Sequence, residues 1–326
     1  METVNIVVPP HPGATAAARI EAVTRIPVSQ LLTAPPAPKA VKIELTAQCN
    51  YACDFCAHAT RQRTRGEMSW PLFTRLVGEM ADAGVEELGF FFIGESFLCD
   101  WLPDAIGHAK ARGIRYAFLT TNGSLASADR VKACMEAGLD ALKFSVNFAT
   151  EAQFRGVAHA RSRLYRDAIA NLKAARRVRD EGGYPCGLYA SSIELDDVQQ
   201  ERMRPLIAEI LPYVDEHYWL PLYSMGAFAT QREEQLGYRP TAGNQGRLGA
   251  LREPLPCWSA FTEGHVTAEG KLSACCFDAT ANWAMGDLNR QSFMDAWHSA
   301  AFVALREAHL RRDVSGTVCQ KCIAYS

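Results

Sequence analysis

Short apolar runs alternate with longer amphipathic segments from residue 41 onward. The apolar runs predict buried strands over residues 41–45, 87–94, 116–123, 141–147, 187–195 and 217–223. The segments between them carry apolar residues at helical spacing and predict helices over 70–84, 101–113, 128–138, 165–179 and 198–214. Because parallel strands need crossovers of this kind, the alternation predicts an α/β fold with a parallel sheet that curls toward an open or closed barrel.

Two regions lie outside this alternation. Residues 1–40 are rich in Pro and Ala and predict an extension with one short helix near Thr15 to Val23, followed by a stiff linker. After the last strand the pattern becomes loop-like, which predicts a linker over 226–249 and a second, smaller unit over 250–326. In that unit a helical spacing of apolar residues predicts one helix over 292–310, with a core face formed by Phe293, Ala296, Trp297, Ala300 and Ala304.

Composition and charge narrow the class of protein. The 326 residues carry 34 Lys plus Arg and 36 Asp plus Glu, and a net charge of −2 offers no electrostatic case for a nucleic-acid or anionic-membrane partner. The amino terminus does not have the pattern of a signal peptide, and no window approaches the ~18 apolar residues of a membrane span. We therefore expect a soluble, cytoplasmic protein. Its 11 cysteines would be kept reduced there, so clustered thiols indicate metal or redox chemistry.

Three thiols follow the first predicted strand. Cys49, Cys53 and Cys56 lie in the loop at the carboxyl end of that strand, which is where parallel sheets place their chemistry. Thiolates select zinc, copper(I) or iron-sulfur clusters, and a closed zinc site usually takes four ligands. No fourth thiol or suitably spaced His lies nearby. Three thiolates on a four-iron cluster would leave one iron free for an outside ligand.

This Cys-x3-Cys-x2-Cys pattern, with Phe55 directly before its last cysteine, resembles the signature of the radical S-adenosylmethionine (radical SAM) enzymes. The resemblance implies that the open iron of a [4Fe-4S] cluster chelates S-adenosylmethionine. One electron then releases a 5′-deoxyadenosyl radical that abstracts a substrate hydrogen atom. It also implies a partial (β/α)6 TIM-like barrel over 41–225, and an electron donor such as flavodoxin or ferredoxin.

The same resemblance extends to the ends of the next three strands. Gly94 and Glu95 stand where the family usually shows Gly-Gly-Glu-Pro, although this chain reads Ile-Gly-Glu-Ser. The resemblance implies that Glu95 accepts from the methionyl ammonium and that Gly94 lets the backbone come close. The other residues that it assigns to cofactor binding are Phe55, Thr121, Asn122, Ser145 and Asn147.

A second set of cysteines occupies the carboxyl-terminal unit. Cys257, Cys275, Cys319 and Cys322, with Gly270 in a Gly-x4-Cys arrangement, resemble the auxiliary-cluster unit called a twitch domain, a shortened SPASM domain. The resemblance implies one auxiliary [4Fe-4S] cluster with four protein ligands, which would carry electrons. A structural zinc site is the plainer alternative.

The adjacent Cys276 leaves the choice of ligand open. If it is free and reaches the active site, Cys276 could donate a hydrogen atom to a substrate radical; the plainer reading is a small buried hydrophobe or an alternative ligand. Cys99, Cys134 and Cys186 are expected to be core residues. The histidines, among them His265 and His309, show no paired ligand spacing and are expected to be surface or satisfied core groups.

Together these features predict a radical SAM oxidoreductase or lyase. We expect a small polar substrate, such as a sugar, aminocyclitol or nucleoside in natural-product assembly, that undergoes dehydrogenation, epimerisation or decarboxylation. A ribosomal peptide is the alternative; it ranks second because the extension over 1–40 is short and Pro-rich for a peptide-recognition domain. A zinc-stabilised binding module without radical chemistry is the hypothesis from another class.

Overall fold

The computed structural model describes residues 15–59, 66–194, 197–223, 255–278, 282–320 and 322. Six parallel strands stand side by side in the order β6-β5-β4-β3-β2-β1. They are β1 (Ala40–Ile43), β2 (Glu87–Gly89), β3 (Tyr116–Thr121), β4 (Ala141–Ser145), β5 (Gly187–Glu194) and β6 (Glu216–Pro221). This arrangement confirms the predicted partial barrel of parallel strands.

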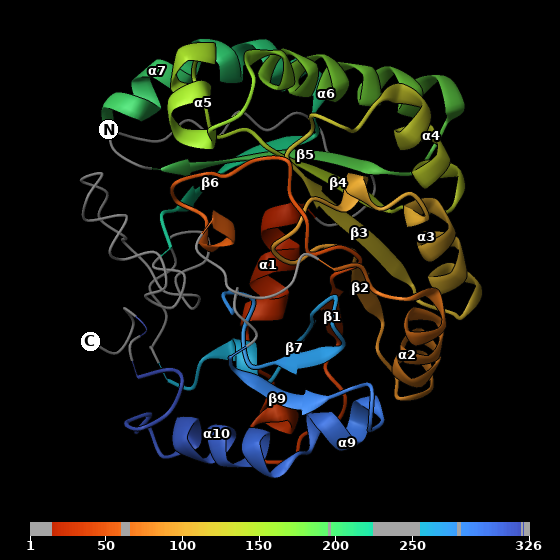
Figure 1. Ribbon diagram of the computed structural model, residues 1–326, viewed down its shortest axis with the longest axis vertical. Coiled ribbons are helices and arrows are strands. Elements are labelled where there is room, and N and C mark those ends of the chain that lie inside the picture. Colours follow the sequence, from red (N-terminus) through yellow and green to blue (C-terminus); the bar gives the residue numbers. More distant parts are fainter. Residues whose placement is uncertain are drawn as a thin grey trace.

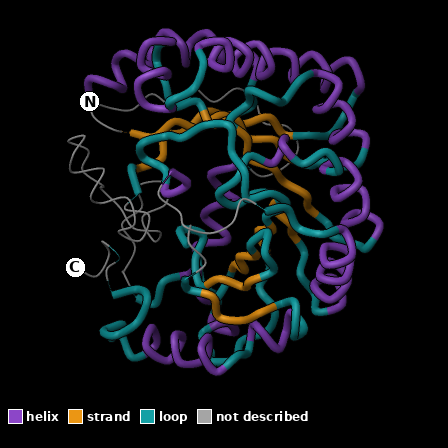
Figure 2. The backbone as a smooth tube through the Cα atoms, viewed as in Figure 1, coloured by secondary structure: helices purple, strands orange, loops and turns teal. Residues whose placement is uncertain are grey.

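Helices cover the outside of these strands (Figures 1 and 2). They are α2 (Trp70–Asp82), α3 (Leu102–Ala111), α4 (Ala128–Glu136), α5 (Glu151–Ala158), α6 (Ser162–Gly182) and α7 (Asp197–Ile210). In α2 the buried residues Phe73, Leu76, Val77 and Met80 follow the spacing that puts one helical face against the sheet. The eight-residue helix α5 was not predicted, and β2 is shorter than its apolar run because the chain bends over residues 92–94.

The amino-terminal helix α1 (Ala16–Thr24) lies inside the curve of the barrel (Figure 1). Arg19 forms an ion pair of 2.7 Å with Glu87, and its guanidinium lies 3.2 Å from the ring centroid of Tyr116. The backbone N–H of Ala16 donates to Glu216 at 2.8 Å. These partners stand at the first residues of β2, β3 and β6. Helix α1 therefore covers the amino-terminal end of the barrel.

The carboxyl-terminal strands continue the same sheet. Strand β7 (Glu263–Val266) pairs in parallel with β1, and β8 (Lys271–Ser273) and β9 (Ala284–Asp287) follow in antiparallel order. Gly270 makes the turn before β8 with φ of +74°, a backbone conformation that residues with a Cβ atom rarely adopt. The two predicted units thus share one nine-stranded sheet, whereas the predicted linker over 226–249 lies outside the described residues.

The single helix predicted over 292–310 is wrong. The chain forms α9 (Phe293–Trp297) and α10 (Ala300–Leu310), and the Ser299 side chain accepts a hydrogen bond from the first turn of α10. This new start changes the helical register, so Phe302 and Leu305 are buried while Ala300 and Ala304 are exposed.

The proline-rich segment before β1 is held by these two helices. Trp297 Nε1 donates to the carbonyl of Pro36 at 3.0 Å, and Arg306 donates to the carbonyl of Thr33 at 3.2 Å. The predicted stiff linker is therefore packed against the carboxyl-terminal part of the chain.

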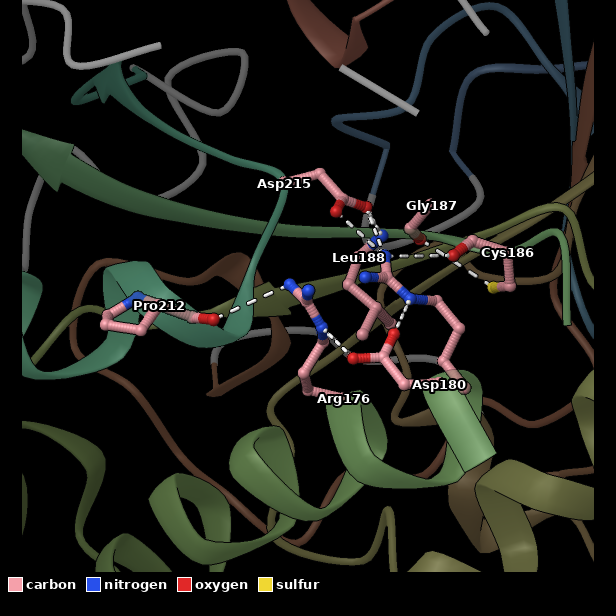
Figure 3. A network of polar contacts seen from close by, with 8 residues as sticks. Arg176, Asp180, Cys186, Gly187, Leu188, Pro212 and Asp215 are labelled. Carbon is pink, nitrogen blue, oxygen red and sulfur yellow. Dashed lines mark hydrogen bonds and ion pairs between the residues drawn. The ribbon is translucent and has the colours of Figure 1, made fainter. Parts of the chain in front are cut away.

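An ion-pair network joins α6 to the adjoining strands (Figure 3). Asp215 accepts from the guanidinium of Arg179 at 2.6 Å and from the backbone N–H of Leu188 at 2.8 Å, while Arg176 pairs with Asp180 on the helix surface. The Asp215 carboxylate fixes the starts of β5 and β6 relative to the end of α6. None of the helices in the described part of the chain combines the length and hydropathy that crossing a bilayer requires.

Candidate active site and the two cysteine groups

The first three thiols lie together at the carboxyl end of β1. Burial, followed by the neighbouring thiols of Cys56 and Cys49, raises the pKa of Cys53 well above its usual value. All three cysteines pack against an apolar cluster that includes Tyr51 and Phe55. The three cysteines thus lie half-buried beside one apolar cluster.

Contacts with α5 shape this cysteine loop. The backbone N–H groups of Ala52 and Asp54 donate to the last residues of α5 at 2.9 and 3.0 Å. The buried carboxylate of Asp54 lies 2.7 Å from Nε2 of His159, which ends the helix in a left-handed conformation with φ of 49°. This support was not predicted, because no helix was expected over 151–158.

Glu95 connects the ends of β2 and β3. Its carboxylate accepts from the Thr121 hydroxyl and from the Asn122 backbone N–H, each at 2.7 Å. Burial raises the pKa of Glu95, while these two hydrogen bonds oppose the rise. The Asn122 side chain in turn donates to Asn50 in the cysteine loop at 2.8 Å. Residues from three strand ends therefore form one polar network.

Gly94 lies where no side chain fits. A Cβ atom at this position would stand 2.0 Å from the carbonyl oxygen of Thr46 and 2.8 Å from that of Gln48. The next backbone N–H, of Glu95, donates to the Gln48 carbonyl at 2.7 Å. The loop after β2 is thus pressed against the segment that enters the cysteine loop.

The remaining predicted cofactor residues line a small neighbouring cavity of about 20 Å³. Asn122, Ser145 and Asn147 form part of its wall, together with aromatic side chains such as Tyr51. The amide oxygen of Asn147 accepts from the backbone N–H of Ile193 at 3.0 Å, which fixes its orientation. The predicted residues of β3 and β4 therefore meet beside the cysteine loop, as the ends of parallel strands must.

These residues fit the cofactors that the resemblance implies. The three thiols lie in one loop beside an apolar cluster, a buried carboxylate stands at the next strand end, and the backbone segments approach each other closely at Gly94. An iron-sulfur cluster needs such thiolates, and the apolar cluster beside them would tune its potential by limiting water.

A larger cavity of about 290 Å³ occupies the barrel interior. Its wall includes Cys56 from the first cysteine group and Cys276 from the second, and Arg19 and Ile20 of α1 also line it. Aromatic rings such as Tyr218 form much of the remainder. One cavity therefore lies between the two cysteine groups.

A buried polar cluster faces this cavity. Lys42 of β1 and Glu263 of β7 form an ion pair of 2.7 Å, and Nε2 of His265 lies 2.9 Å from the same carboxylate. A hydrogen bond with Cys275, followed by the effects of Lys42 and His265, lowers the pKa of Cys276 well below its usual value. His265 was expected to be an ordinary core or surface group, and no local pattern indicates that Lys42, 221 positions before Glu263, completes this cluster.

Cysteines of the second group influence one another. Burial, together with the thiols of Cys257 and Cys322, raises the pKa of Cys319. A hydrogen bond with Cys276, followed by burial, raises the pKa of Cys275, and the Cys257 thiol adds to this rise, whereas Lys42 and His265 act on Cys276. Cys275 therefore belongs with the cysteines of the carboxyl-terminal part, and Cys276 faces the barrel.

His309 adjoins this second group, a contact that was not predicted. Its Nδ1 accepts from the backbone N–H of Cys257 at 3.2 Å, and its Nε2 lies 3.4 Å from the sulfur of Cys319. Burial lowers the pKa of His309 to about 4, so the ring is neutral at pH 7. Because Nδ1 is an acceptor, the proton lies on Nε2 and is directed at sulfur.

Comparison with known families identifies the two cysteine regions. Residues 43–188 match the family model of the radical SAM superfamily, and residues 257–323 match the model of the iron-sulfur cluster-binding SPASM domain. Between them these models cover more than half of the chain. The chain belongs to the radical SAM superfamily and carries a SPASM domain.

Curated relatives of this radical SAM protein include PqqA peptide cyclases. The one from Xanthomonas axonopodis pv. citri (strain 306) is 26% identical over 313 residues, which span 88% of this chain and 80% of the relative. A PqqA peptide cyclase from Streptomyces rochei is 31% identical over 147 residues, or 45% of this chain and 38% of that one.

Solved structures share the fold. SuiB of Streptococcus suis bound to S-adenosylmethionine has a TM-score of 0.65 and 13% identity, covering 89% of this chain and 72% of that chain. BtrN in complex with AdoMet and 2-DOIA has a TM-score of 0.57 and 18% identity, covering 87% and 92%. Family and fold together establish a radical SAM enzyme that works with S-adenosylmethionine and [4Fe-4S] clusters. They leave no support for the zinc-stabilised module.

Proposed function

We propose that this radical SAM enzyme oxidatively modifies a peptide, one of whose side chains enters the barrel cavity. The observation that carries the proposal is the match to peptide cyclases along 88% of the chain. SuiB, solved with its precursor peptide SuiA, has a TM-score of 0.64 and covers 94% of this chain, so a barrel of this type is compatible with a peptide substrate.

The shape of the cavity supports entry of a single side chain. Its volume of about 290 Å³ lies at the lower end of the range for ligand pockets, and α1 covers the amino-terminal end of the barrel. This proposal reverses the preference for a small metabolite drawn from the sequence. That preference relied on the shortness of residues 1–40, yet helix α1 within this segment lines the cavity.

The reaction that we propose removes two hydrogens from the peptide. When bound, the clusters and S-adenosylmethionine supply a radical that takes one hydrogen atom, and an acceptor for one electron. The second hydrogen must then leave the substrate as a proton. We assign Glu263 to receive that proton, because its carboxylate lines the cavity between Lys42 and His265.

The cluster ligands and the cofactor-binding residues that we propose are those that the family resemblance implies. Cys49, Cys53 and Cys56 would hold the first cluster, and Cys257, Cys275, Cys319 and Cys322 the auxiliary one. Phe55, Gly94, Glu95, Thr121, Asn122, Ser145 and Asn147 would bind S-adenosylmethionine. Cys276 lines the cavity, so loss of product in Cys276→Ala with intact clusters would indicate hydrogen-atom donation and an epimerisation instead.

A small polar metabolite remains the second candidate. BtrN, which was solved with 2-DOIA, matches this chain along 92% of its own length. A cavity of about 290 Å³ has room for an entire molecule of this kind.

Release of 5′-deoxyadenosine distinguishes the two candidates. The reconstituted, dithionite-reduced enzyme is incubated anaerobically with S-adenosylmethionine and either short peptides encoded beside its gene or a panel of aminocyclitols, sugars and nucleosides. We expect release stimulated by a peptide that loses the mass of two hydrogens. Stimulation by a metabolite and by none of the peptides would overturn the proposal.

A further inference from the structure

Glu44 is a buried carboxylate that the cofactor assignments do not use. It follows β1 directly and lies five positions before Cys49, and only 1% of its surface is exposed. A carboxylate buried to this degree is costly unless several donors satisfy its oxygens.

Its donors come from two distant parts of the chain. Oε1 accepts from the backbone N–H groups of Ile93 and Gly94 at 3.2 and 3.1 Å. Oε2 accepts from the backbone N–H of Ala268 at 3.1 Å. The backbone N–H of Glu44 itself donates to the carbonyl of Val266 at 2.9 Å. One side chain thus bridges segments that lie 49 and 224 positions away.

Both segments lead to a cofactor site. Ile93 and Gly94 precede Glu95, whose carboxylate joins the polar network of Thr121 and Asn122. Ala268 lies in the turn between β7 and β8, and β8 leads directly to Cys275. A shift of the Glu44 carboxylate would therefore move both the Gly94 loop and the hairpin of the auxiliary cysteines.

We propose that Glu44 is a positioning residue that couples the S-adenosylmethionine-binding loop at Gly94 to the β7–β8 hairpin of the SPASM domain. The three backbone donors hold the loop and the hairpin against the same carboxylate, so ordering one of them stabilises the other. The proposal rests on the residue assignments made above but on neither candidate substrate.

The test uses the reconstituted protein without reductant, so that S-adenosylmethionine binds but is not cleaved. Hydrogen exchange is measured with and without S-adenosylmethionine over segments 91–97 and 264–272. In the native protein we expect the cofactor to slow exchange in both segments. Slowing over 91–97 alone would overturn the proposal, because the hairpin would then be independent of the loop.

The variant Glu44→Gln tests the carboxylate itself. A Gln side chain has a single acceptor oxygen, so its amide N–H₂ must face a backbone donor on one side. We expect S-adenosylmethionine to bind about tenfold more weakly, at unchanged iron content, with loss of the exchange response over 264–272. Glu67→Gln is the matched control, since Glu67 is exposed and pairs with Thr46 in the same region.

The possible outcomes are distinct. Native affinity together with a native exchange response in Glu44→Gln would overturn the proposal. If the variant fails to fold, the exchange experiment on the native protein still decides the matter. Failure of every peptide to stimulate turnover would leave both measurements unaffected, since neither contains a substrate.

Discussion

The carboxylate of Glu95 and the backbone N–H of Asn122 are joined by a hydrogen bond of 2.7 Å that links the ends of β2 and β3. The second carboxylate oxygen accepts from Thr121, the last residue of β3. The side chain is therefore held in one orientation before any ligand arrives. Such preorganisation lowers the entropy cost of binding.

Replacing Glu95 with Gln should weaken cofactor binding. The amide retains the size of the carboxylate, but it must direct its N–H₂ toward either Thr121 or the Asn122 N–H, and it loses the charge proposed to meet the methionyl ammonium. We expect affinity for S-adenosylmethionine to fall by tenfold or more, on the order of 1.5–3 kcal/mol for a charge-assisted hydrogen bond. Equilibrium dialysis with the reconstituted protein measures this, and unchanged affinity would contradict the assignment.

The carboxyl-terminal cysteines permit a ligand test. Cys276 lines the barrel cavity, whereas Cys275 does not, and the pKa of Cys275 responds to the Cys257 thiol. If two four-iron clusters are present, the native protein holds about eight irons. We expect Cys275→Ser to lose up to half of that iron and Cys276→Ser to retain it. The opposite pattern in iron and sulfide assays would assign Cys276 as the ligand.

Much of this site could be predicted from local pattern. The loop with Cys49, Cys53 and Cys56 follows an apolar run, and the ends of parallel strands must share one edge, so Glu95 and Thr121 were expected to lie near that loop. Gly94 stood out because the family signature has a glycine there. The structure shows the physical reason, since a Cβ atom at this position would collide with the Thr46 carbonyl oxygen.

The rest depended on contacts between distant parts of the chain. The ion pair of Lys42 and Glu263 joins residues 221 positions apart, and no local pattern indicates it. A helix near Thr15 was predicted, but its place inside the barrel depends on the pairing of Arg19 with Glu87. The break at Ser299 was missed because the apolar spacing on its two sides mimics one continuous helix.

His309 should raise the reduction potential of the auxiliary cluster. Its neutral ring directs Nε2–H at the sulfur of Cys319, and hydrogen bonds to ligand sulfurs are among the factors that set cluster potentials. We expect His309→Phe, which cannot donate, to have a lower midpoint potential at equal iron content. Redox titration followed by electron paramagnetic resonance measures it. A potential equal to that of the native protein would show that the contact does not tune the cluster.

Arg306 should contribute strongly to stability. The side chain is fully buried, donates to the carbonyls of Ala260, Thr33 and Trp297, and stacks on the Trp297 ring. Burial lowers its pKa to about 9, so burying the charge itself costs stability, and the three carbonyl acceptors and the stacked ring offset this cost; no carboxylate pairs with it among the residues that the structure describes. We expect Arg306→Ala to leave these acceptors unsatisfied and to lower the free energy of unfolding by about 3 kcal/mol.

Anaerobic denaturant unfolding of the cluster-loaded protein checks this value. Arg311→Ala is the control, because that side chain is largely exposed at the end of the same helix and should change stability by no more than about 0.5 kcal/mol. Equal effects of the two substitutions would mean that Arg306 is not the anchor of the proline-rich segment.

His217 should make stability depend on pH. Its Nε2 lies 2.9 Å from the Ser192 hydroxyl and its ring packs against Trp219, and burial lowers its pKa from 6.5 to about 4. Between pH 4 and pH 6.5 the unfolded chain binds more protons at this site than the folded chain. The contribution of His217 to the free energy of unfolding therefore rises with pH. It is complete above about pH 6.5 and is lost as pH falls toward 4. Allowing for partial exposure, we expect it to reach about 2 kcal/mol.

The measurement compares denaturant midpoints at pH 7.5 and pH 5.5 for the native protein and for His217→Gln. The amide can still bond to Ser192 but does not titrate, so the difference between the two midpoints should be smaller in the variant. Other groups, including the clusters, contribute equally to both proteins and cancel in this comparison. The same difference in both proteins would mean that His217 accepts its proton in the folded state as readily as in the unfolded one.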